Sequence, residues 1–140
     1  MPTAKRTLRI SILACSLAAT AAVAADWTEI ATDADGNRYS IDQQSIVRDG
    51  STVKGVVRAE YASPRMDDAS GKSFFAALDR MVVDCEAASF ALQSRTYVAA
   101  DGSEVPALAS AREDLKLRPA AAGSLSETIV RSLCRAARRK

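Results

Sequence analysis

The stretch from Ser73 to Ala100, SFFAALDRMVVDCEAASFALQSRTYVAA, sets two apolar runs on either side of the short acidic segment Asp84-Cys85-Glu86. By spacing alone, the first run, 73–85, fits a helix as well as a strand. Its Phe-Phe and Val-Val pairs and its β-rich surroundings favour a strand. The second run has apolar or β-branched residues at alternate positions, Phe90, Leu92, Thr96 and Val98, and ends at Asp101-Gly102. We therefore predict two long strands that meet near Cys85.

The last segment of the chain has the pattern of an amphipathic helix. Ser124 and Glu127 have the spacing of a capping box, which satisfies free amides of a first helical turn. A single apolar stripe follows, made of Leu125, Ile129, Val130, Leu133 and Cys134. We predict a helix over about 125–138 whose stripe, Cys134 included, is buried against a sheet.

The first 25 residues have the organisation of a secretory signal peptide. Lys5, Arg6 and Arg9 precede an uncharged run, 10–25, that ends in small residues. Such a basic head, short apolar centre and small-residue exit are typical of these peptides, and the run is too short and too rich in alanine for a membrane span. We expect cleavage after Ala24 or Ala25, and export through the inner membrane.

A competing interpretation of the same segment is lipidation at Cys15, because Ile12-Leu13-Ala14-Cys15 loosely resembles a lipobox. The apolar stretch before this cysteine is shorter than the roughly 7 to 15 residues of an ordinary apolar centre. Membrane association of the mature chain would be expected only in that case.

Export decides how the cysteines are interpreted. Cys15 leaves with the signal peptide, so the mature chain keeps two cysteines in an oxidising compartment and only one pairing is available. We predict a disulfide between Cys85 and Cys134, which fixes the helix to the sheet. Closing a loop of this length is worth roughly 4 kcal/mol in the chain-entropy model.

The rest of the mature chain, 26–140, is predicted to be one domain. Short alternating strands begin at Trp27, Tyr39 and Ile46, and turn residues separate them. The clearest strand follows, with Val53, Val57, Ala59 and Tyr61 on one face. We expect the sheet to occupy about 27–100, with an exposed loop at 62–72, and an irregular linker to occupy about 101–123.

The charge of the mature chain is polarised. It carries 16 basic and 17 acidic residues, but the segment from Asp26 to Val130 has a net charge of −6 and the last ten residues have +5. This distribution, together with export, argues against a nucleic-acid-binding domain. The basic residues of the tail form a candidate binding face, although cations are also favoured near any helix C-terminus. They are Arg131, Arg135, Arg138, Arg139 and Lys140.

Taken together, these features resemble the surface-adhesin protein E family of Gram-negative bacteria, over roughly 26–135. The matching features are W-T-E-I at Trp27, D-G-N-R-Y-S-I-D at Asp35 with S-I-V-R-D-G after it, the Asp84-Cys85 pair and Cys134. The resemblance implies an α+β fold: a curved antiparallel sheet of about six strands with a C-terminal helix on its concave side, held by one disulfide. It also implies adhesion to matrix components such as vitronectin, laminin or heparin-like glycans.

The residue types offer little catalytic chemistry. The chain has no histidine, so Ser-His-Asp and Cys-His machinery and ordinary zinc or haem ligand sets are excluded. Asp67-Asp68 lies among loop residues, where solvated charges are the rule. The stretch 33–37 imitates the start of a calcium loop, but Arg38 and Gln44 stand where that loop needs glycine and glutamate. We expect no catalytic residue, metal or cofactor.

Two functions stay open at this point. The first is a surface adhesin that binds a matrix protein or a sulfated glycan. The second is a periplasmic structural or protein-interaction module with the same fold. The exposed edges of an open sheet would also allow two copies to pair as a homodimer.

Overall fold

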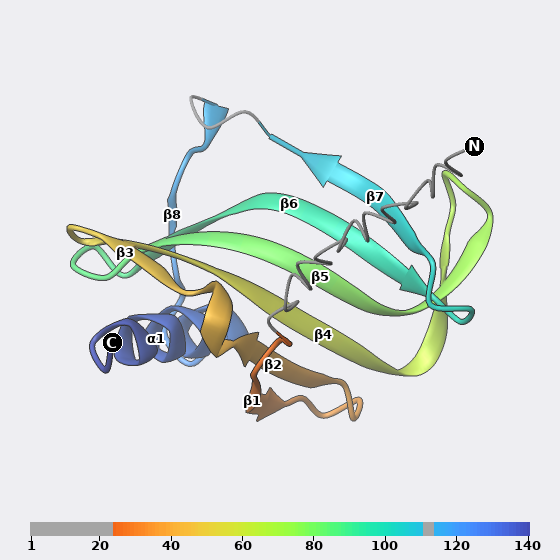
Figure 1. Ribbon diagram of the computed structural model, residues 1–140, viewed down its shortest axis with the longest axis horizontal. Coiled ribbons are helices and arrows are strands. Elements are labelled where there is room, and N and C mark those ends of the chain that lie inside the picture. Colours follow the sequence, from red (N-terminus) through yellow and green to blue (C-terminus); the bar gives the residue numbers. More distant parts are fainter. Residues whose placement is uncertain (1–23, 111–113) are drawn as a thin grey trace, which may run out of the picture.

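A computed structural model describes residues 24–110 and 114–140, so the predicted signal peptide, with Cys15, lies almost entirely outside the described residues. The fold is α+β: one open, curved antiparallel sheet with a single helix on its concave side (Figure 1). The strands along the main path of the sheet are β1 (Trp27–Thr32), β2 (Arg38–Asp42), β4 (Thr52–Asp67), β5 (Lys72–Asp84), β6 (Ser89–Ala99) and β7 (Glu104–Ala109). Two short strands lie off this path, β3 (Val47–Asp49) beside β4 and β8 (Arg118–Pro119) beside β6. A 3₁₀ turn, η1 (Gln43–Ser45), precedes β3, and the helix is α1 (Leu125–Ala137).

The centre of the sheet is the long hairpin of β4 and β5. Alternate residues of β4 point toward the helix, and Val53 and Val83, which pair across the two strands, have no exposed surface. The buried face of β4 is therefore the one that its alternating sequence predicted. The predicted loop at 62–72 is wrong in extent, because β4 continues through Pro64 to Asp67 and β5 begins at Lys72. Only the tip of this hairpin is a turn.

The ambiguous run at the start of the 73–100 stretch is a strand, as predicted, but a bulge at Phe75 breaks its alternation. Register shifts between β5 and β6 fall at Phe74/Ala76 and at Arg80/Met81. The first leaves Phe75 exposed, whereas Phe74 is buried and stacks on Tyr97 with 4.0 Å between ring centroids. A bulge adds one residue and so moves the following side chains to the other face. The first shift therefore breaks the alternation of the 73–85 run, whereas the second is a bulge at Gln93 of β6, opposite Arg80 and Met81.

The helix begins and packs as its pattern predicted. The Ser124 hydroxyl accepts a hydrogen bond from the Glu127 amide at 3.2 Å, and the Glu127 carboxylate accepts one from the Gly123 amide at 2.7 Å. The stripe residues Ile129, Val130, Leu133 and Cys134 are buried in the core. Leu133 packs directly over Gly55 of β4, where a larger residue would keep the helix off the sheet.

The predicted irregular linker over 101–123 is wrong in part, because it contains β7 and β8. β7 pairs with β6 along the edge of the sheet, although it contains Pro106 and three alanine or leucine positions without polar alternation. The ladder with β6, not a local pattern, holds these residues extended. β8 pairs with the start of β6 through Arg118 and Pro119, just before the chain enters the helix.

Candidate functional site: the basic end of the C-terminal helix

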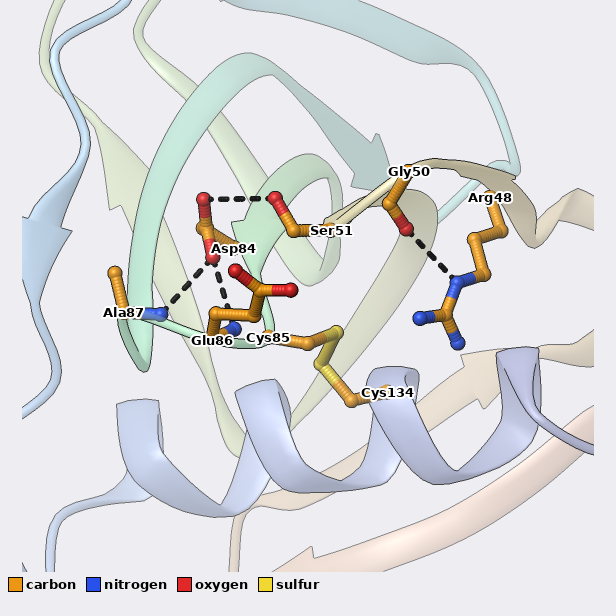
Figure 2. The surroundings of a disulfide bond; sticks show 8 residues. All are labelled: Arg48, Gly50, Ser51, Asp84, Cys85, Glu86, Ala87 and Cys134. Atoms are coloured by element: carbon orange, nitrogen blue, oxygen red, sulfur yellow. Dashed lines mark hydrogen bonds between the residues drawn. A yellow bond between two sulfur atoms is a disulfide. The ribbon is translucent and has the colours of Figure 1, made fainter.

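The disulfide predicted between Cys85 and Cys134 is present, with 5.8 Å between the two Cα atoms (Figure 2). Cys85 follows β5 directly, and its amide donates to the Ser51 carbonyl at 2.9 Å. Cys134 lies on the buried stripe of α1. The bond therefore ties the third turn of the helix to the end of the central hairpin.

Asp84 holds the turn that carries Cys85. Its carboxylate accepts hydrogen bonds from the amides of Glu86 at 2.9 Å and Ala87 at 3.0 Å, and from the Ser51 hydroxyl at 3.2 Å (Figure 2). These donors, the Ala87 amide first, favour the charged form and lower the pKa of Asp84 below 3.8, against a smaller effect of desolvation. Asp84, in the acidic segment beside the cysteine, thus stabilises a turn.

The five basic residues of the predicted binding face are all exposed and gather at the C-terminal end of α1: Arg131, Arg135, Arg138, Arg139 and Lys140. Among the described residues, the one ion pair that involves them joins the exposed Arg131 to the partly exposed Glu127 at 3.8 Å. Lys140 donates from Nζ to the Ile46 carbonyl at 3.1 Å, which draws the end of the chain toward η1.

The same residues flank two hollows, one on each side of the helix. Arg131, Arg135 and Arg138 line a hollow of ≈ 200 Å³ beside the disulfide. Arg135 and Arg139 line another of ≈ 360 Å³ against the N-terminal strands, where Glu29 and Gln43 complete the wall. Arg131, Arg135 and Arg138 are four and three residues apart, so helical spacing alone predicts the first grouping. Arg139 joins the second because β1 and β2 pack beside the end of the helix.

The other residues that the sequence singled out have structural partners. Asp33 accepts hydrogen bonds from the Asn37 amide and side chain and from the Tyr39 hydroxyl, at 2.9–3.0 Å. The Asn37 side chain is the main cause of the lowered pKa of Asp33; burial, with the bond to Asp33, raises the pKa of Tyr39 to about 12. This stretch is a tight turn, and across 24–110 and 114–140 no cluster of acidic residues or cysteines could hold a metal ion.

Asp42 and Asp67 act similarly. Asp42 accepts from the Gln44 amide at 3.0 Å and so caps η1, and Asp67 accepts from the Ser70 amide at 3.0 Å within the turn at the hairpin tip. Both carboxylates thus support local turns, which is the structural interpretation of these residues.

Nothing in the sequence indicated a third hollow, on the concave face of the sheet. The helix does not extend over the sheet past its own N-terminal turn. A cavity of ≈ 370 Å³ lies there, between the helix and the concave face of the sheet. We call it the concave cavity; its walls come from β2, β4, β5, β6, β8 and α1. Arg95 of β6 lines it together with Leu92, although simple alternation would put these two residues on opposite faces. A bulge lies near Gln93, where Met81 pairs with Leu92 and Arg80 with Ser94. This bulge places Arg95 on the same face of the sheet as Leu92.

These features define a class of protein: a curved antiparallel sheet closed on its concave side by one disulfide-linked C-terminal helix with a basic end. The model of the surface-adhesin protein E family matches residues 27–135, and the chain belongs to that family. No curated protein and no solved structure matches the chain significantly. Within the described residues, no helix is long and apolar enough to cross a membrane.

Proposed function

We propose that this protein is an exported, non-catalytic adhesin of the cell envelope of a Gram-negative bacterium, and that it binds matrix components through the basic end of α1. Membership of the surface-adhesin protein E family supports an adhesin-like protein at the surface. The family also points to a non-enzymatic role. The ligand and the contact residues are our proposal.

The observation that carries the proposal is the concentration of positive charge at the C-terminal end of α1. Arg135, Arg138 and Arg139 have no carboxylate within ion-pair distance among the described residues, while the segment 26–130 carries a net charge of −6. The helix macrodipole favours cations at this end by only about 0.3–1 kcal/mol each, which leaves their charge open to a stronger partner. The surplus charge is available to an external anion.

The ligand class that fits is a sulfated glycan or an acidic stretch of a matrix protein. Guanidinium groups bind sulfate and carboxylate oxygens with paired hydrogen bonds. Arg131, Arg135 and Arg138 follow one another along one side of the helix and present a row of cations, which suits a linear polyanion better than a small compact ion. Attraction of this kind is screened over about 8 Å at physiological ionic strength.

The test is heparin affinity of the purified mature protein. The triple variant Arg135→Gln, Arg138→Gln, Arg139→Gln should elute from heparin at a much lower salt concentration than wild type. The matched control Lys72→Gln, Arg80→Gln, Lys116→Gln loses the same charge from exposed sites elsewhere on the molecule. Equal elution of the two triple variants would show that net charge alone matters and would contradict a specific face.

Surface location is tested separately, by protease shaving of intact cells. An epitope tag inserted at the exposed hairpin tip, between Asp68 and Ser70, leaves the ladders of β4 and β5 in place. Digestion of the tag in whole cells would support the adhesin. Protection until lysis would favour the alternative, a periplasmic structural or protein-interaction module, and would remove the reason to test host ligands.

A further inference from the structure

The concave cavity has the size and shape of a small-molecule site. Its volume of ≈ 370 Å³ lies within the range of about 300–1,000 Å³ that is usual for such pockets. The helix covers the disulfide end of the sheet only, and the long strands continue past the start of α1 toward the tip of the β4–β5 hairpin (Figure 1). The floor is thus formed by side chains of the central strands of the sheet.

The floor changes character along the strands. Next to the helix it is apolar, with Val57, Met81 and Leu92 facing Leu125 and Ile129 of the first two helical turns. Farther toward the hairpin tip it becomes charged and aromatic. A ligand that fills this cavity would therefore place an apolar part near the helix and a polar part toward the hairpin.

The polar end is positively charged. Arg95 donates from Nε and Nη2 to the two carboxylate oxygens of Asp79, both at 2.7 Å, and this bond raises the pKa of Arg95, so the guanidinium stays charged. The negative charge of Asp79 is thereby balanced by the positive charge of Arg95. Arg65 adds a second guanidinium, 4.0 Å from the centre of the Tyr61 ring. One carboxylate thus faces two guanidiniums at this end of the cavity, which leaves a surplus of one positive charge.

Tyr61 lines the cavity together with these cations and supplies a neutral hydroxyl. Burial raises its pKa, although Arg95 and Arg65 oppose the rise, so the phenol keeps its proton at neutral pH. Within the described residues, its hydroxyl makes no hydrogen bond to protein, whereas the Tyr39 hydroxyl is already bonded to Asp33. A protonated phenol beside two guanidiniums is a set of donors suited to a carboxylate.

We propose that the concave cavity binds a small amphipathic anion, a single acyl chain that ends in a carboxylate. The chain lies over Val57, Met81 and Leu92, under Leu125 of the helix, and the carboxylate meets Arg65, Arg95 and the Tyr61 hydroxyl. A third cation, Arg118, lies 5.7 Å from the Phe90 ring at the helix end of the cavity. It would not contact the carboxylate in this orientation. This site is distinct from the basic end of α1, because none of its lining residues belongs to that group.

The test uses decanoate as the probe, with the mature protein, by titration calorimetry at fixed salt. Decanol has the same chain without charge, and decyltrimethylammonium has the opposite charge. We expect saturable binding of one decanoate per chain, and at least about tenfold weaker binding of both other probes, which is the usual worth of a charge-assisted hydrogen bond. Methyl resonances of Met81, Leu92 and Ile129 should shift with the same midpoint. Equal affinity for decanol, or an absence of saturable binding, would overturn the proposal.

Variants fix the orientation and separate this site from the adhesive face. Arg65→Gln should weaken decanoate binding about tenfold, whereas Arg118→Gln and the control Arg80→Gln, which lies outside the cavity, should change it little. Ser126→Trp, at a partly exposed position on the cavity wall, should block decanoate while circular dichroism shows an intact fold. The triple variant of Arg135, Arg138 and Arg139 should bind decanoate as wild type does. An equal loss for Arg80→Gln and Arg65→Gln, or undiminished binding by Ser126→Trp, would contradict the assignment.

Discussion

Gly55 is a point of close contact between the sheet and α1. A Cβ atom at this position would lie 2.7 Å from Cδ2 of Leu133, which is fully buried. We therefore expect Gly55→Ala to destabilise the fold by about 1–3 kcal/mol through overpacking, measured by urea unfolding. In combination with Leu133→Ala, which alone should cost about 2–5 kcal/mol by leaving a cavity, the two losses should be less than additive. Additive losses would show that this contact does not limit the helix position.

Asp84 gives the turn at Cys85 a dependence on acid. Its folded pKa lies below the ordinary 3.8, so the ionised carboxylate stabilises the fold fully above that value, and the contribution is lost as the pH falls through the folded pKa. We expect Asp84→Asn to lower the melting temperature at pH 7 and to reduce the acid-induced loss between about pH 4 and pH 2. The control is Asp68→Asn, because the hydrogen bond in that turn is accepted by the neighbouring Asp67. Identical acid profiles for wild type and Asp84→Asn would refute this role.

The disulfide is a covalent link between helix and sheet. Replacing both cysteines, Cys85→Ala with Cys134→Ala, should reduce the free energy of unfolding by roughly 2–5 kcal/mol, because the unfolded chain gains the freedom of a loop that spans 49 residues of sequence. Urea unfolding of this variant, beside wild type in a reducing agent, measures the loss. If both keep the stability of the oxidised protein, the bond is not what holds α1 in place.

The start of α1 depends on its cap. Ser124→Ala removes the acceptor for the Glu127 amide and should cost about 1 kcal/mol of stability. Ser126→Ala, in the same helical turn, is the matched control, because no hydrogen bond of its hydroxyl is present in the described structure. Thermal unfolding should rank wild type and Ser126→Ala together above Ser124→Ala, and the reverse ranking would be evidence against the cap.

How far the sequence could predict each element depended on where its stabilising contacts come from. The capping box, the stripe of α1 and the alternation of β4 are local patterns, and each was correctly predicted. β7 and β8 were missed because their conformation comes from pairing with β6, while Pro106 and the alanines carry no strand pattern of their own. In β6, simple alternation places Thr96 and Val98 on the same face as Leu92. The bulge near Gln93 reverses the alternation, so these two residues lie on the opposite face.

The two proposed sites show the same division. The basic residues of the tail are close in sequence, so their grouping on one helix was accessible from spacing. The concave cavity draws its walls from six separate elements, and Arg95 reaches it only through a bulge. Such a site has no signature in a single sequence. It becomes visible only when the register of the sheet is known.

The two sites lie at opposite ends of α1, with the basic residues at its C-terminus and the concave cavity beside its first turns. The disulfide, beside the basic residues, fixes the helix against the sheet. Loss of the disulfide should therefore affect both sites, whereas substitutions at one end should leave the other unchanged. This independence is what allows heparin affinity and decanoate binding to be tested in the same set of variants.

The open edge of the sheet bears on whether the protein pairs with itself. β7 ends the main strand path, and Leu108 there is 45% exposed. Pro106 lies in the middle of this strand and offers no N–H group to an incoming strand, a common protection of sheet edges. We expect Pro106→Thr to increase concentration-dependent self-association, measured by sedimentation equilibrium. Ala107→Thr, the neighbouring control, raises strand propensity without restoring an N–H group and should associate as wild type does. If wild type already forms a dimer that Pro106→Thr does not strengthen, the copies pair through a surface other than this edge.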